Sequence, residues 1–196
     1  MSGPSATPNL IDVDESQLVV IDVQPGFLSK IDPNAAMELT DRVRWLITLA
    51  RRLNVPVTVT EEDPLLNGAS DDAVLTALPS GTRRHEKPTF GLTGSPHILS
   101  AVQAHNRNTA VLCGLETDVC VAQSALGLAA QGLRVIVVTD ACAAPGTGHE
   151  QGLQRTRDMG IEHIGVKGLA YEWIRTVADA YDVMDDDLGS PRGISL

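Results

Sequence analysis

A chain of 196 residues that is 43% hydrophobic has enough apolar side chains for one sizeable core and is too short for a second full domain. Its formal net charge of −10, without a basic run longer than two arginines, argues against nucleic acid as a partner. No stretch resembles a signal peptide or a membrane span, and three cysteines are too few for a disulfide framework. We therefore expect a cytoplasmic protein with free thiols and no membrane contact.

Two hydrophobic patterns alternate along the chain. Short apolar, β-branched blocks predict strands, and apolar positions at helical spacing predict helices. In chain order we expect a strand over 18–21, a helix over 35–53, a strand over 57–60, a short helix near 72–78, a helix over 96–105, a strand over 109–113, a helix over 118–131, a strand over 134–139, a helix over 149–159, a strand over 163–166 and a helix over 170–181.

Strands that alternate with helices are typical of βαβ units and a parallel sheet. The right-handed crossover rule then favours a single-domain, doubly wound α/β fold, a three-layer α/β/α sandwich around a mostly parallel, Rossmann-like sheet. We place this domain at residues 17–184. Residues 1–16 are expected to form an N-terminal arm, of which 1–8 are the loosest part, and residues 185–196 an extended C-terminal tail.

Polar residues follow the predicted strands at the points where a parallel sheet binds its ligands, beyond the carboxyl ends. Asp22 directly follows the first strand, and Cys120 lies a few residues after the strand over 109–113. Each also has a plain structural interpretation, since such an aspartate often caps a turn and a free cysteine is often a small buried residue. Cys113 and Cys142 fit that second interpretation.

Three fragments in this order resemble the motifs of the isochorismatase-like cysteine hydrolases. They are Val20-Ile21-Asp22-Val23-Gln24 with Phe27 after it, Lys87-Pro88 with Phe90 after it, and Thr117-Asp118 with Cys120-Val121 after it. The resemblance covers roughly residues 17–180. It implies Asp22 as the acid/base, Lys87 as its cationic partner and Cys120 as the nucleophile. It further implies a cis peptide bond between Leu115 and Glu116, a small-molecule substrate and a homo-oligomer.

Physical chemistry gives these residues matching roles. A thiol with a pKa of about 8.5 needs help to ionise near neutral pH, and a helix start, the Lys87 ammonium and the Asp22 carboxylate would supply it. The backbone N–H groups of Cys120 and Glu116 would form an oxyanion hole. Gln24, Phe27 and Phe90 are placed to line the substrate pocket, with core packing as the alternative.

The expected reaction is cleavage of a C–N bond in a small amide, ureide or carbamoyl compound through a thioester, without a cofactor. Metal-binding relatives carry an aspartate and closely spaced histidines after the second strand, whereas this chain has Glu61-Glu62-Asp63 there. We interpret these acids as a solvated face and predict no metal site. Two alternatives stay open: vinyl-ether hydrolysis without a covalent intermediate, as in the isochorismatase branch, and a non-catalytic binding or scaffold protein.

Overall fold

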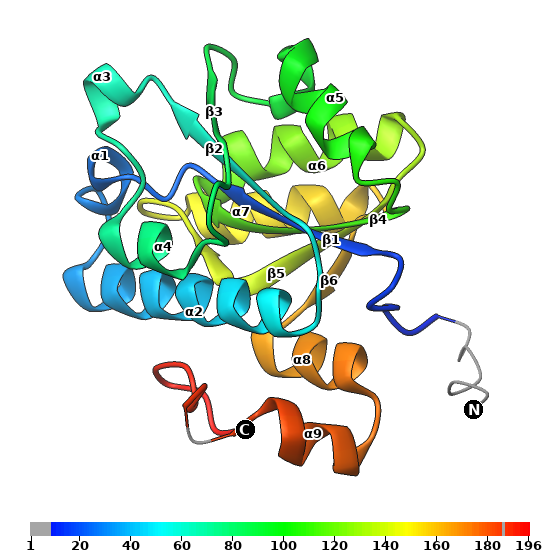
Figure 1. Ribbon diagram of the computed structural model, residues 1–196. Coiled ribbons are helices and arrows are strands. Elements are labelled where there is room, and N and C mark those ends of the chain that lie inside the picture. The colour runs from blue at the N-terminus through cyan, green and yellow to red at the C-terminus, as the bar shows by residue number, and fades with distance from the viewer. Residues whose placement is uncertain (1–8, 186) are drawn as a thin grey trace.

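The computed structural model describes residues 9–185 and 187–196. At its centre is a six-stranded sheet in the order β3-β2-β1-β4-β5-β6, with all neighbouring strands parallel (Figure 1). The strands are β1 (Ser16–Ile21), β2 (Val57–Glu62), β3 (Arg84–Lys87), β4 (Thr109–Leu115), β5 (Arg134–Ala143) and β6 (Glu162–Ile164). The chain winds outward from β1 to β3 and then from β4 to β6, which confirms the predicted doubly wound α/β sandwich.

Helices cover both faces of this sheet (Figure 1). They are α1 (Pro25–Leu28), α2 (Pro33–Arg52), α3 (Pro64–Asn67), α4 (Asp72–Ala77), α5 (Pro96–Ala104), α6 (Ala122–Ala130), α7 (Gly148–Asp158), α8 (Val166–Ile174) and α9 (Val177–Val183), with a 3-10 turn η1 (Leu92–Gly94) and a π-helical turn η2 (Thr117–Val121). Side chains of α2, α4 and α8 share one apolar cluster, and those of α5 and α6 share the other.

The alternation of side chains along a strand explains the two clusters. Leu18 and Val20 of β1 point into the cluster with α2, and Val19 and Ile21 point into the opposite one. All four are fully buried. Because burial of each such side chain is worth about 1.5–3 kcal/mol, the apolar blocks that predict strands also hold the sheet between its helices.

The two innermost strands, β1 and β4, leave no room for a side chain at Gly114. This residue has a φ of 124°, and a Cβ built there would lie 1.9 Å from the carbonyl oxygen of Ile21. The ladder between β4 and β5 shifts register at the same point. Glycine at position 114 therefore allows the ends of β1 and β4 to lie side by side, where the strand order reverses and ligands bind in folds of this class.

The C-terminal part of the domain departs from the prediction. We expected one helix over 170–181, but α8 ends at Ile174 and α9 begins at Val177. Arg175 has a φ of 72°, which a continuous helix does not allow, and the Thr176 hydroxyl caps α9 by accepting from the Asp179 N–H at 3.1 Å. The chain turns here because this cap starts a new helix.

The segments outside the domain are held against it. The prediction for residues 1–8 lies outside the described residues, but Ile11 is buried and its N–H donates to Glu172 at 2.6 Å. The tail is not extended, because the N–H groups of Leu188 and Gly189 donate to the Asp185 carbonyl in a turn. Leu188 is buried, and the Gly189 carbonyl accepts from the Trp45 indole at 2.9 Å. Both segments therefore add contacts to the core.

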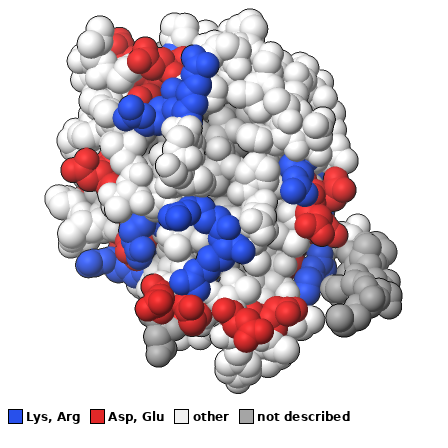
Figure 2. All heavy atoms as spheres, in the orientation of Figure 1, with Lys and Arg blue, Asp and Glu red and all other residues white. Residues whose placement is uncertain are grey.

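On the face shown in Figure 2, acidic and basic residues lie in mixed groups rather than in one basic patch. Among the helices of the described residues, none combines the length and the apolar character that crossing a bilayer requires.

Candidate active site

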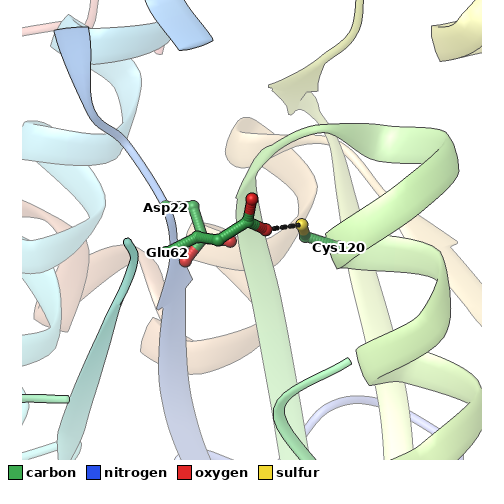
Figure 3. Close-up of side chains that lie close together, drawn as sticks. All are labelled: Asp22, Glu62 and Cys120. Atoms are coloured by element: carbon green, nitrogen blue, oxygen red, sulfur yellow. Dashed lines mark hydrogen bonds between the residues drawn. The ribbon is translucent and has the colours of Figure 1, made fainter. Parts of the chain in front are cut away.

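Four side chains from four elements meet beyond the carboxyl ends of the strands. Asp22 directly follows β1, Glu62 ends β2, Lys87 ends β3, and Cys120 lies in the turn η2 after β4. Figure 3 shows Asp22, Glu62 and Cys120 pointing toward one another. The structure thus brings together the three residues that the sequence indicated and adds Glu62 to them.

Asp22 and Lys87 form an ion pair inside the protein. The Lys87 Nζ lies 2.7 Å from Asp22 Oδ2, and neither side chain is exposed to solvent. Asp22 Oδ1 accepts from the Thr60 hydroxyl at 2.7 Å. Burial raises the pKa of Asp22, although Lys87 opposes this, and the pKa of Lys87 is raised because its anionic neighbours outweigh its burial. The ammonium is therefore charged and held against the carboxylate.

Glu62 is the functional residue that our sequence analysis missed. Its Oε2 accepts from the Cys120 thiol at 3.1 Å and lies 3.3 Å from Lys87 Nζ. The β2 strand continues to Glu62, so side-chain alternation places Glu62 on the same side as Thr60, which contacts Asp22. Extending the predicted strand by two residues would have revealed this orientation.

The acidic stretch Glu61-Glu62-Asp63 is therefore not one solvated face, as we had expected. Glu61 is buried and accepts from both the N–H and the hydroxyl of Ser70, at 2.8 and 2.7 Å. Asp63 is exposed and its carboxylate faces the Leu66 N–H in the first turn of α3. Only the middle residue of the three faces the cysteine.

Cys120 is 2% exposed and sits in a helical turn that begins at Thr117, as the sequence indicated. Its electrostatic surroundings differ from the expectation. Burial, followed by the charge of Asp22, raises the pKa of the Cys120 thiol, and Glu62 raises it further, while Lys87 acts in the opposite direction. These surroundings favour a thiol that donates to Glu62 over a thiolate stabilised by the helix start.

The segment before Cys120 has the backbone geometry that the resemblance implies. The peptide bond between Leu115 and Glu116 is cis, and the Glu116 carbonyl accepts from the N–H groups of Val119 and Val121. The Glu116 carboxylate pairs with Lys30 at 3.0 Å. The use of the Glu116 and Cys120 N–H groups as an oxyanion hole stays a prediction.

A cavity of about 570 Å³ opens beside this group. We call it the mouth cavity; its lining residues are Glu62, Asp63, Pro64, Leu65, Glu86, Lys87, Pro88 and Phe90. Phe90 lies in it as expected and is 55% exposed. The structure gives the other two expected pocket residues different places: Gln24 is fully buried and holds the Glu62 backbone through its amide, and Phe27 packs in the core.

Asp22, Glu62 and Cys120 have the composition of a possible metal site, with one ligand atom from each lying within 4.8 Å of the others. The Lys87 ammonium, however, contacts both carboxylates, at 2.7 and 3.3 Å. A divalent cation bound by the three would lie beside this fixed positive charge. The residues present thus favour the lysine as the cation of the group.

Known proteins share both the sequence pattern and the fold. The family model described as the isochorismatase domain matches residues 16–167. Isochorismatase family protein 2B of Dictyostelium discoideum is 23% identical over 198 residues, which cover 96% of this chain and 90% of that protein.

Two solved structures have closely similar folds. The Escherichia coli YcaC protein, described as an octameric hydrolase of unknown specificity, superposes with a TM-score of 0.83 at 23% identity and covers 92% of this chain and 89% of its own. YcaC from Pseudomonas aeruginosa, solved with hexane-2,5-diol and covalent acrylamide, gives 0.82 at 23% identity, with 91% and 90% covered. Because the family model spans most of the chain, this protein is a member of the isochorismatase family of hydrolases.

Proposed function

We propose that this protein cleaves a C–N bond of a small amide, ureide or carbamoyl compound through a thioester on Cys120. The observation that carries the proposal is the Cys120 thiol, which donates to a carboxylate at 3.1 Å within a group that also holds a buried carboxylate–ammonium pair. A sulfur nucleophile needs a nearby proton acceptor, and this arrangement supplies one.

In the first step the sulfur attacks the carbonyl carbon while its proton moves to Glu62 Oε2, the atom it already faces. The carbonyl oxygen gains negative charge, which the Glu116 and Cys120 N–H groups would stabilise by about 3–4 kcal/mol per donor. Lys87, in contact with both carboxylates, compensates the charge of the group. The proton acceptor at rest is thus Glu62 rather than Asp22.

In the second step the C–N bond breaks and the leaving nitrogen takes up the proton that Glu62 Oε2 received from the sulfur. Asp22, the acid/base that the family resemblance implies, lies within 4.8 Å of the other two groups and acts in our proposal as the carboxylate that deprotonates water in the next step. Water, deprotonated by a carboxylate of the group, then attacks the thioester carbonyl, releases the acid product and returns the proton to sulfur. Atoms and charges balance without a cofactor.

An ammonia-release screen tests this function. Purified protein is incubated with small primary amides, ureides and carbamoyl compounds, and the Cys120→Ala protein serves as the blank. We expect ammonia release only from the wild type, at a rate that EDTA leaves unchanged, because Lys87 already supplies the positive charge. Loss of the activity in EDTA with recovery on adding zinc would contradict the metal-free site, and no release from any compound would contradict the proposed reaction.

Glu62→Gln separates the roles of the two carboxylates. Glu62 raises the pKa of the Cys120 thiol, so its neutralisation lowers that pKa and should speed alkylation by iodoacetamide at pH 7 several-fold. Amide turnover should fall by about 10²–10⁴-fold, because the proton acceptor is lost. Stopped-flow turnover and alkylation rates are compared with those of Glu61→Gln, a neighbouring buried acid outside the group. If Glu62→Gln changed the alkylation rate and the amide turnover rate by the same factor, Glu62 would act only through its charge and not as the proton acceptor.

We further infer that the chain forms a homo-oligomer, as its octameric relative from Escherichia coli does. Light scattering should give a multiple of the 20.8 kDa chain mass, and a value of 20.8 kDa would contradict the inference.

A further inference from the structure

We propose that the mouth cavity receives the part of the substrate beyond the scissile amide, and that it takes substrates whose far end is positively charged or neutral and discriminates against carboxylates. This inference rests on the proposed function for the choice of amide, but it concerns the charge of the site, which is measured without turnover.

Among the charged side chains of the cavity wall, acids outnumber bases. Three of the lining residues, Glu62, Asp63 and Glu86, carry carboxylates. Lys87 is the one basic residue among the described residues that line the cavity. The Lys87 ammonium is 0% exposed and lies 2.7 Å from Asp22 and 3.3 Å from Glu62. Its charge is thus already matched by two carboxylates, and the field that a ligand meets is negative.

Two basic residues on neighbouring elements also face acids. Arg84, two residues before Glu86 on β3, lies 3.8 Å from the Glu61 carboxylate. Lys30 lies 3.0 Å from the Glu116 carboxylate. Among the described residues that line the cavity, none is an arginine or histidine that would pair with a substrate carboxylate. A bound anion would therefore lose its hydration without gaining a counter-charge.

The remaining lining residues are apolar. Leu65 is 100% exposed and Phe90 is 55% exposed, and Pro64 and Pro88 flank them. Such a wall suits an aliphatic spacer between the amide and its far end. The exposed ring of Phe90 also attracts a cation placed over its face, which strengthens the same preference.

Charge-matched methanethiosulfonates measure this field at the sulfur. The Cys120 thiolate attacks the sulfenyl sulfur, a disulfide forms and methanesulfinate leaves, so the rate reports the approach of the reagent. We compare the cationic trimethylammonium-ethyl reagent, the anionic sulfonatoethyl reagent and the neutral methyl reagent, each divided by its rate with 2-mercaptoethanol. Mass spectrometry identifies the labelled cysteine, and Cys120→Ala protein gives the background.

The cationic reagent should react about tenfold faster than the anionic one at low ionic strength, and the ratio should approach one in about 1 M salt. The double variant Asp63→Asn, Glu86→Gln should reduce the ratio several-fold. Its matched control, Asp158→Asn with Glu150→Gln on exposed positions of α7, should leave the ratio unchanged. A ratio of one or below in the wild type, or equal effects of the two double variants, would overturn the proposal.

The amide screen supplies the second arm. β-Alaninamide and succinamate differ mainly in the charge at the far end, and the cationic compound should have the higher kcat/KM. If β-alaninamide and succinamate were hydrolysed at equal rates, the proposed charge preference would be wrong and the proposed reaction would be supported. A tenfold labelling ratio without hydrolysis of any amide contradicts the proposed reaction and supports the charge assignment.

Discussion

Replacing Cys120 by alanine is expected to abolish amide turnover, by on the order of 10⁶-fold, while the protein stays folded. The nucleophile is the atom that forms the bond to the substrate, and the other three side chains cannot substitute for it. Removal of one buried sulfur should cost only about 1–2 kcal/mol of the free energy of unfolding, since the cavity it leaves is small. Lys87 would still pair with both carboxylates.

Ammonia release and urea unfolding measure the two sides of this prediction. Cys142→Ala is the matched control, because Cys142 is also buried and lies near the carboxyl end of β5, but outside the group around Cys120. It should keep near-normal turnover. Retention of more than a few per cent of turnover in the Cys120 variant, or loss of turnover in the control alone, would refute the role of Cys120.

Replacing Lys87 by methionine is expected to destabilise the protein by about 3–5 kcal/mol near neutral pH, because it leaves a buried carboxylate without its partner. Lys87 and Asp22 are both 0% exposed, and their charged atoms lie 2.7 Å apart. Methionine fills similar space, so the loss reports charge rather than a cavity. Turnover should also fall, since the group around Cys120 loses its only ammonium among the described residues.

The loss should depend on pH in a defined direction. The pKa of Asp22 is raised above its ordinary value by burial, and the contacts with Lys87 limit that rise. Without Lys87 this pKa rises further. Stability from a group whose pKa is raised by folding is present at low pH and is lost as the pH rises through the folded-state value. The deficit should therefore be smaller at pH 5 than at pH 8.

Urea unfolding at both pH values checks this, with Lys167→Met as the control, because Lys167 is exposed and its ammonium donates to a backbone carbonyl of the tail. The control should lose at most about 1 kcal/mol at either pH. If the Lys87 variant lost the same free energy of unfolding at pH 5 and at pH 8, its instability would not come from the unpaired Asp22 carboxylate.

The elements that the sequence predicted well are those with dense apolar signals. The β1 strand contains the continuous apolar block over residues 18–21, buried on both faces, and a parallel sheet interior produces that pattern. By contrast, β3 is a polar edge strand, Arg84-His85-Glu86-Lys87, with no apolar alternation, so a pattern-based prediction passes over it. Lys87 was placed in the site by resemblance, and its strand could not have been found from hydrophobicity.

The candidate site was predictable where a residue directly follows a buried strand and much less where burial changes chemistry. Asp22 is an example of the first kind, and Cys120 lies in the turn η2 shortly after β4. The protonated state of the Cys120 thiol is an example of the second, because it depends on how completely Asp22, Glu62 and the sulfur are removed from water. Sequence spacing contains no measure of that burial. The tail was also unpredictable, since Leu188 packs in an apolar cluster built mainly by residues distant in the sequence, among them those of α2.

The strand order divides the site between two stretches of the gene. Every residue of the mouth cavity lies within residues 62–90, in or after β2 and β3, whereas the sulfur follows β4 in the other half of the sheet. Changes in the length or composition of the first stretch can reshape what is bound while the nucleophile keeps its place. Under the proposed role of the mouth cavity, descendants of such a chain, natural or engineered, would acquire new substrates by altering the other residues of this segment while Glu62, Lys87 and Cys120 stay in place.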